Sequence, residues 1–162
     1  MKGTASETLP LGSVSSVRAA AICAFGVALA SVTGSLFPPG QWYAQLNQPL
    51  GTPPDIAFPI AWTLLYIAMA VAAWLVWRSV GFGKALKLFT LQLVLNAAWT
   101  PISFGAHLLV GSVVLIIAIW LALAATIVEF WFANRVASLL LWPYLAWSTY
   151  AAYLAIGLAL LN

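Results

Sequence analysis

Charged residues are scarce in this sequence. Only six Lys and Arg and three Asp and Glu residues occur among 162 residues, together with one His and one Cys. A chain that is 64% apolar has too little polar surface to cover a soluble fold, which excludes the soluble globular class. The single Cys23 excludes an intramolecular disulfide, and we expect it to pack as a small apolar side chain within a helix.

The positions of the few ionisable residues do not fit several classes of membrane protein. A retinal protein needs a Lys in the middle of a helix, whereas Lys84 and Lys87 fall at a helix end. A bis-His haem protein needs two imidazoles inside the bundle, but His107 is the only histidine. Glu129 is expected near the inner end of a helix, which does not favour an ion pump with carboxylates inside the membrane. We therefore predict no metal site, no hydrolase triad and no obligatory cofactor.

Long apolar runs are what the sequence has in abundance. Three of the connections between them are only a few residues long, which favours antiparallel neighbours in one bundle. Five runs approach or exceed the roughly 20 residues that a helix needs to cross a bilayer, at 19–36, 58–77, 85–104, 108–131 and 136–161. We predict an all-α membrane protein with one five-helix transmembrane domain over residues 18–162, after a disordered tail over residues 1–17.

The basic residues predict an orientation. With five crossings, all of them fall on the face that carries the N-terminus: Lys2, Arg18, Arg78, Lys84, Lys87 and Arg135. Because basic loops stay in the cytoplasm, we expect the N-terminus to be cytoplasmic and the C-terminus periplasmic, in a bacterial inner membrane. The same bias accounts for the net charge of +3, so the lipid bilayer is an expected partner and nucleic acid is not.

Aromatic and amide side chains are expected inside the predicted helices. At a rise of 1.5 Å per residue, Trp62 lies about one turn below the outer face, Asn96 one turn below Trp99, and Trp147 near the middle of its helix. Polar hydrogens in hydrocarbon need partners, which favours positions facing the bundle interior. There they either pack as core aromatics or line a ligand cavity. The residues in question are Trp62, Tyr66, Asn96, Trp99, Trp147 and Tyr150.

The loop over residues 37–57 is too long for a simple connection in a bundle, and it contains five prolines, Pro38, Pro39, Pro49, Pro53 and Pro54. These fix φ and make the loop stiff. Trp42, Tyr43 and Leu46 recur at helical spacing, which predicts a short helix over the outer end of the bundle. We expect a structured lid that includes Trp42, Leu46, Pro53 and Pro54. The alternative is an anchor at the membrane interface.

A series of motifs in order along the chain resembles the TspO/MBR family, which includes the tryptophan-rich sensory proteins and the translocator proteins, formerly called peripheral benzodiazepine receptors. The resemblance implies a five-helix bundle, often dimeric, with a cavity under the first loop that binds tetrapyrroles such as protoporphyrin IX and haem, and in some members sterols or synthetic ligands. It runs from about Gly34 to Ala155. The motifs are Trp42-Tyr43 with Leu46, Pro49 and Pro53-Pro54; Phe58-Pro59, Ala61-Trp62-Thr63 and Leu65-Tyr66; Gln92-Leu93, Asn96, Trp99-Thr100-Pro101 and Phe104-Gly105; and Pro143-Tyr144-Leu145-Ala146-Trp147.

The resemblance also implies site residues. Trp62 and Trp147 match tryptophans implicated in light-dependent breakdown of bound porphyrin. Pocket or lid positions of the family match Tyr43, Asn96, Trp99 and Ala151, and the expected ligand site is Tyr43, Trp62, Tyr66, Asn96, Trp99, Trp147, Tyr150 and Ala151. The chain departs from the family at Gly51, where many members have Trp, and at Ala155, where many have Asn. We therefore expect a looser lid and a different ligand preference.

Several functions stay open at this point. The leading expectation is a membrane receptor or sensor whose tryptophans stack on a porphyrin while the loop closes over it. Ligand carboxylates at the mouth would be met by Trp, Tyr and backbone donors. The alternatives are a photochemical role for Trp62 and Trp147, a transporter of porphyrin or another apolar ligand, and a structural partner protein that packs through small residues. A homodimer is expected from the resemblance.

Overall fold

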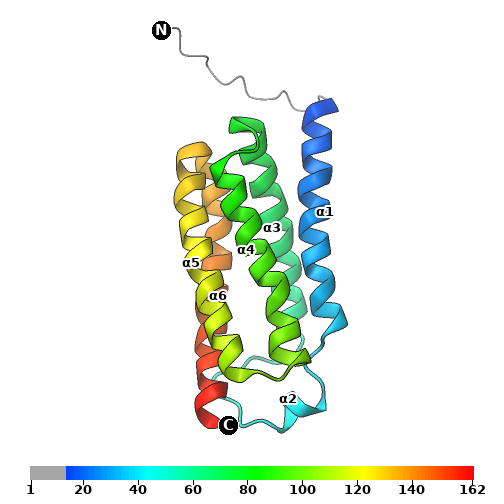
Figure 1. Cartoon of the computed structure of the whole chain (residues 1–162), viewed down its shortest axis with the longest axis vertical. Helices are drawn as coiled ribbons and strands as arrows, with labels where there is room; N and C mark the ends of the chain where they lie inside the picture. Colours follow the sequence, from blue (N-terminus) through cyan, green and yellow to red (C-terminus); the bar gives the residue numbers. More distant parts are fainter. Residues whose placement is uncertain (1–13) are drawn as a thin grey trace.

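The computed structural model describes residues 14–162, and this part of the chain forms helices and connecting loops (Figure 1). The helices are α1 Val14–Leu36, α2 Gln41–Gln45, α3 Ala57–Val80, α4 Lys84–Thr100, the π-helical turn η1 Pro101–Gly105, α5 Leu109–Ala133 and α6 Arg135–Leu161. Four of them, α1, α3, α5 and α6, are long and apolar enough to cross a membrane. Helix α4 has 17 residues, and η1 continues it directly. The predicted all-α membrane bundle is confirmed.

Helix α1 begins earlier than the sequence suggested. The predicted tail over residues 1–17 overlaps the described part of the chain only at 14–17, and those residues are helical. The reason is a contact with α3, because the Trp74 indole Nε1 donates to the carbonyl oxygen of Ser16 at 3.1 Å and to its Oγ at 3.3 Å. The rest of the predicted tail, residues 1–13, lies outside the described residues.

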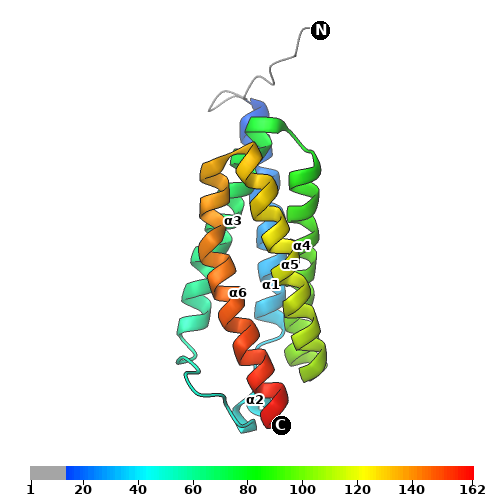
Figure 2. The ribbon, with the colours of Figure 1, turned by 90° about the vertical axis from the view of Figure 1, so that its left-hand side faces the viewer.

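The five long helices form a closed ring. Each packs mainly against two neighbours, in the order α1, α3, α6, α5, α4 and back to α1. The two views show an upright bundle with the α3–α4 and α5–α6 connections at one end, and α2 and the C-terminus at the other (Figure 1, Figure 2). Large apolar side chains on the outside, such as Phe25, Val114 and Phe132, are more than half exposed, as suits a surface that faces lipid.

The half of the ring nearest the α3–α4 and α5–α6 connections is filled with side chains. Phe89 and Phe130 stack there with ring centroids 5.8 Å apart. The buried residues include Met69, Val76, Phe89, Leu123, Phe130 and Leu141. We call this region the packed half. The ion pair between Lys84 Nζ and Glu129 Oε1, at 2.6 Å, lies at this end of the bundle, and so do the basic residues Arg78, Lys87 and Arg135.

The first loop, residues 37–56, joins α1 to α3 at the opposite end of the bundle (Figure 1). It contains α2, and Leu46 is the C-terminal cap of that helix. The loop is held to α6 by hydrogen bonds from Tyr150 Oη to the Gly51 carbonyl at 2.5 Å and from Tyr153 Oη to the Leu50 carbonyl at 2.8 Å. Gly51 has φ of 82°, which lies in the left-handed region that favours glycine over residues with a side chain.

Candidate functional site

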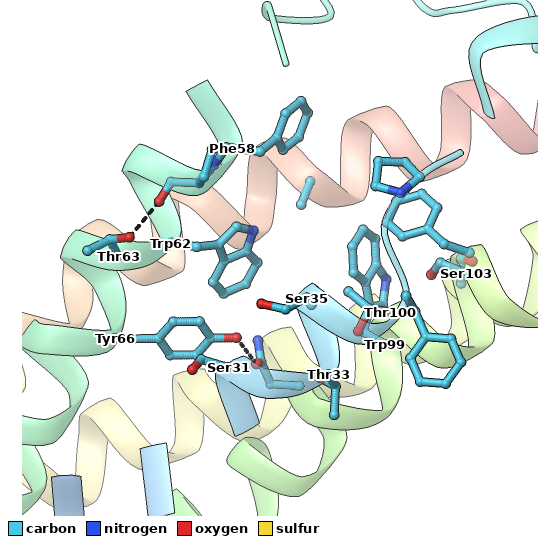
Figure 3. A pocket seen from close by; sticks show the side chains of 18 of the residues that line it. Ser31, Thr33, Ser35, Phe58, Trp62, Thr63, Tyr66, Trp99, Thr100 and Ser103 are labelled. Carbon is cyan, nitrogen blue, oxygen red and sulfur yellow. Dashed lines mark hydrogen bonds between the residues drawn. The ribbon is translucent and has the colours of Figure 1, made fainter. Parts of the chain in front are cut away.

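A cavity of about 820 Å³ lies inside the ring at the end near the first loop. This volume is within the range of roughly 300–1,000 Å³ that is usual for small-molecule sites. Helices α1, α3, α4 and α6, the turn η1 and the first loop all contribute to its wall, as Figure 3 shows in part. Eight aromatic residues line it, Phe37, Trp42, Tyr43, Phe58, Trp62, Tyr66, Trp99 and Phe104. The site is thus a mainly apolar, aromatic cavity.

The turn η1 shapes one wall of this cavity. Pro101 has no backbone N–H to donate, and the helix widens there into a π-helical turn in which the Ala106 N–H bonds to the Pro101 carbonyl at 2.8 Å. The turn places the Phe104 ring edge-on to Tyr43, with centroids 5.4 Å apart, and edge-on to Trp99, with centroids 5.5 Å apart. The wall from α4 is thereby joined to the first loop through aromatic contacts.

A chain of hydrogen bonds crosses the floor of the cavity. Tyr66 Oη donates to Asn96 Oδ1 at 2.9 Å, and Asn96 Nδ2 donates to Tyr144 Oη at 2.8 Å; Figure 3 shows the bond from Tyr66. Trp62 stacks on Tyr66 with centroids 5.3 Å apart and lies edge-on to Tyr144 at 5.9 Å. Because Asn96 and Tyr144 are buried, these bonds satisfy polar groups that would otherwise be stranded in the membrane.

The structure brings together most of the residues that the sequence suggested for the site. The cavity wall includes Tyr43, Trp62, Tyr66, Asn96, Trp99 and Ala151, and Trp42 from the expected lid. Trp147 and Tyr150 are not among the lining residues. The Trp147 ring lies edge-on to Phe58 with centroids 5.9 Å apart, and Phe58 itself lines the cavity. Leu46, Pro53 and Pro54, which were expected in a lid, are also not among the lining residues.

The wall contains polar residues that were not among the expected site residues, including Asp55, Thr100 and Ser103. Among the described residues that line the cavity, Asp55 is the only one with a formal charge. On α4 and η1, the side-chain atoms Trp99 Nε1, Thr100 Oγ1 and Ser103 Oγ are buried without a hydrogen-bond partner in the protein. Helical spacing from Trp99 was the signal available, because Ser103 follows it by four residues and so falls on the same face.

Two residues at the end of the bundle near the first loop differ in their surroundings. The imidazole of His107 is exposed and stacks on Trp42 instead of entering the cavity. Burial, with smaller contributions from Asp55 and Tyr150, raises the pKa of the Tyr43 phenol above the usual range of tyrosine. Tyr43 is therefore a protonated hydrogen-bond donor at neutral pH.

In the part of the chain from residue 14 onward, no group of three or more His, Cys, Asp and Glu side chains is placed to hold a metal ion.

Comparison with known proteins extends over nearly the whole chain. The model of the TspO/MBR family matches residues 19–161. Protein CrtK of Rhodobacter capsulatus is 37% identical over 142 residues, which cover 83% of this chain and 87% of that protein. The tryptophan-rich sensory protein of Cereibacter sphaeroides is 40% identical over 75% of this chain and 77% of its own length. The translocator protein of Homo sapiens is 39% identical over 78% of this chain and 79% of its own length.

Proposed function

The chain belongs to the TspO/MBR family of membrane sensor and translocator proteins, and on this premise we propose that it is a receptor for tetrapyrroles such as protoporphyrin IX or haem. The observation that carries the proposal is the aromatic cavity of about 820 Å³. Trp62 on α3 and Trp99 on α4 both turn their rings toward it (Figure 3). Flat, mainly apolar macrocycles gain both area burial and ring stacking from such walls.

The first loop supplies the polar contacts at the mouth. Tyr43 lines the cavity there and keeps its proton, so it can donate a hydrogen bond to the edge of a ligand. Trp42 lines the same region and is held by the ring of His107, with centroids 4.0 Å apart. In the proposed complex these two aromatic side chains lie over the ligand and limit its exchange with solvent.

A titration in the dark tests this proposal. Purified protein in detergent is titrated with protoporphyrin IX while tryptophan fluorescence is followed. Saturable quenching is expected, and Trp62→Phe should weaken it more than Trp147→Phe, because only the first of these indoles lines the cavity. Quenching that does not saturate, or that both variants leave equal to wild type, would contradict the placement of the ligand.

Light-dependent breakdown of bound porphyrin is a second candidate function. The favouring observation is the stack of Trp62 on Tyr66 and its edge contact with Tyr144. In the proposed step, the photoexcited porphyrin takes one electron from the Trp62 indole, giving a porphyrin anion radical and an indole cation radical. The two radicals then couple into a covalent porphyrin–indole adduct, which interrupts the conjugation of the macrocycle and needs no other reactant. Loss of porphyrin absorbance under light, but not in the dark, should then depend on Trp62. Breakdown that proceeds equally in Trp62→Phe would argue against it.

Transport of the same ligand is the remaining alternative of the family. The packed half stands between the cavity and the end of the bundle that carries Lys84 and Glu129. Passage of a ligand through the ring would require these tightly packed side chains to separate. Flux of porphyrin across sealed liposomes distinguishes a transporter from a receptor that binds and releases at one end.

A further inference from the structure

Three unpartnered polar groups form a row on the α4 and η1 wall of the cavity. They are Trp99 Nε1, Thr100 Oγ1 and Ser103 Oγ, and the Ser103 side chain is only 4% exposed. Figure 3 shows the three residues on the wall that α4 and η1 provide. We propose that this row is a subsite for an uncharged hydrogen-bond acceptor, such as an ester carbonyl, and that together with Asp55 it makes the cavity selective for neutral, esterified tetrapyrroles over free dicarboxylates. The inference rests on the proposed function and specifies its ligand class.

Other hydroxyl groups of the cavity wall show that the row is unusual. Ser112 Oγ donates to the Leu108 carbonyl at 2.9 Å, and Thr63 Oγ1 donates to the Pro59 carbonyl at 2.7 Å. These bonds to a preceding turn are the usual solution for a hydroxyl in a helix. Thr100 and Ser103 make no such bond. A buried polar group without a partner is costly, so the row is better satisfied by a ligand than by the protein alone.

The side chains of this row favour a ligand group that accepts hydrogen bonds. The indole Nε1–H of Trp99 is a donor only, while the hydroxyls of Thr100 and Ser103 can donate or accept. A carbonyl oxygen has two lone pairs and can receive two of these donors at once. A ligand that approaches this wall with a ketone or ester carbonyl would therefore satisfy groups that the protein leaves unpaired.

The charges of the cavity disfavour a carboxylate. None of the described lining residues is Lys, Arg or His, so an ionised ligand group would be buried without a counter-charge. The one formal charge on the wall is the carboxylate of Asp55, which repels another anion. Esterification removes the ligand charge but keeps the carbonyl acceptor. Asp55 thus acts as a determinant of specificity.

The test compares protoporphyrin IX with its dimethyl ester on the same variants. Dissociation constants are measured in the dark by tryptophan quenching, and each variant is compared with wild type for one ligand, which cancels partition of that ligand into detergent. Asp55→Asn should tighten the diacid by about threefold to tenfold while changing the ester less. Ser103→Ala and Thr100→Val should each weaken the ester by about threefold to tenfold.

Ser112→Ala is the matched control for Ser103→Ala. Both serines line the cavity and are almost fully buried, at 5% and 4% exposed, but only Ser112 already has a backbone partner. Ser112→Ala should therefore lose clearly less affinity for the ester than Ser103→Ala does. Equal effects of the two variants would show that the row has no special role and would overturn the subsite.

The remaining outcomes separate this inference from the proposed function. Asp55→Asn that leaves the affinity for the diacid equal to that of wild type overturns the selectivity, while saturable quenching by either porphyrin leaves tetrapyrrole binding in place. If neither porphyrin gives saturable quenching, the proposed function fails. Benzophenone, a neutral aromatic ketone, then tests the subsite alone: weaker binding to Ser103→Ala than to Ser112→Ala supports it, and equal binding overturns it.

Discussion

The indole of Trp42 lies parallel to the imidazole of His107, with ring centroids 4.0 Å apart and planes inclined by 10°. Trp42 belongs to the first loop, while His107 belongs to the connection between η1 and α5. The stack therefore joins two loops that are distant in the sequence, and Trp42 is the member of the pair that lines the cavity. His107 also has φ of 56°, a conformation that few residues other than glycine adopt readily.

Removing the His107 ring should speed the release of ligand. His107→Gly keeps the backbone conformation accessible but deletes the stack on Trp42, and we expect the dissociation rate of a bound porphyrin to rise by about twofold to tenfold, since aromatic pairs contribute roughly 0.5–1.5 kcal/mol. Stopped-flow displacement measures this rate. His107→Phe retains a ring for Trp42 and should release ligand more slowly than His107→Gly; the reverse order would contradict the role of the stack.

Breaking the hydrogen-bond chain on the cavity floor should destabilise the bundle. Asn96→Leu leaves the fully buried hydroxyl of Tyr144 without its partner, and we expect a loss of about 1–2 kcal/mol in the free energy of unfolding. Unfolding in mixed micelles with increasing SDS measures it. Because the two residues share one bond, the double variant Asn96→Leu, Tyr144→Phe should lose less than the sum of the single variants. Additive losses would show that the bond contributes nothing.

Much of the fold was predictable from sequence because membrane spans are long apolar runs. The start of α1 was not, since it depends on the Trp74 bond to Ser16, a contact between distant segments. Depth along a helix follows from residue count, which is why the sequence could suggest Trp62 and Asn96 as cavity residues, and both line the cavity. The direction in which a side chain points depends on how helices pack. For this reason the sequence could not show that Phe58 lines the cavity while Trp147, which contacts the Phe58 ring, does not. A ligand role for Trp147 stays a prediction.

Filling the space at Gly157 should displace the first loop. A Cβ at this position would lie 2.7 Å from Cβ of Pro49, a ring atom that has little freedom to move. Gly157→Ala is expected to cost about 1–3 kcal/mol of stability, as overpacking does, and to make the first loop more susceptible to protease. Gly26→Ala is the control, because nothing lies within 4 Å of a Cβ there. Equal protease resistance of both variants would contradict the contact.

Ionisation of Tyr43 should occur at higher pH than for an exposed tyrosine. Burial raises its pKa first, and Asp55 and Tyr150 add to the effect. The folded state thus favours the neutral phenol, so the stability from this group is fully present below the unfolded pKa and is lost as pH rises through the folded pKa. Difference titration by ultraviolet absorbance, wild type against Tyr43→Phe, isolates this transition. Asp55→Asn should lower the pH at which this transition occurs. A transition at the usual pKa of tyrosine would contradict the burial of Tyr43.

The division of the ring into a packed half and a cavity has a mechanical consequence. Close-packed side chains such as Phe89 and Phe130 compress very little, so that end behaves as a stiff base. The other end surrounds about 820 Å³ of space, and its helices can splay or close without giving up dense contacts. The bundle therefore has one stiff end and one end that can deform. Any movement that widens or narrows the cavity is therefore expected at the end of the bundle that carries the first loop, while the opposite end keeps its shape.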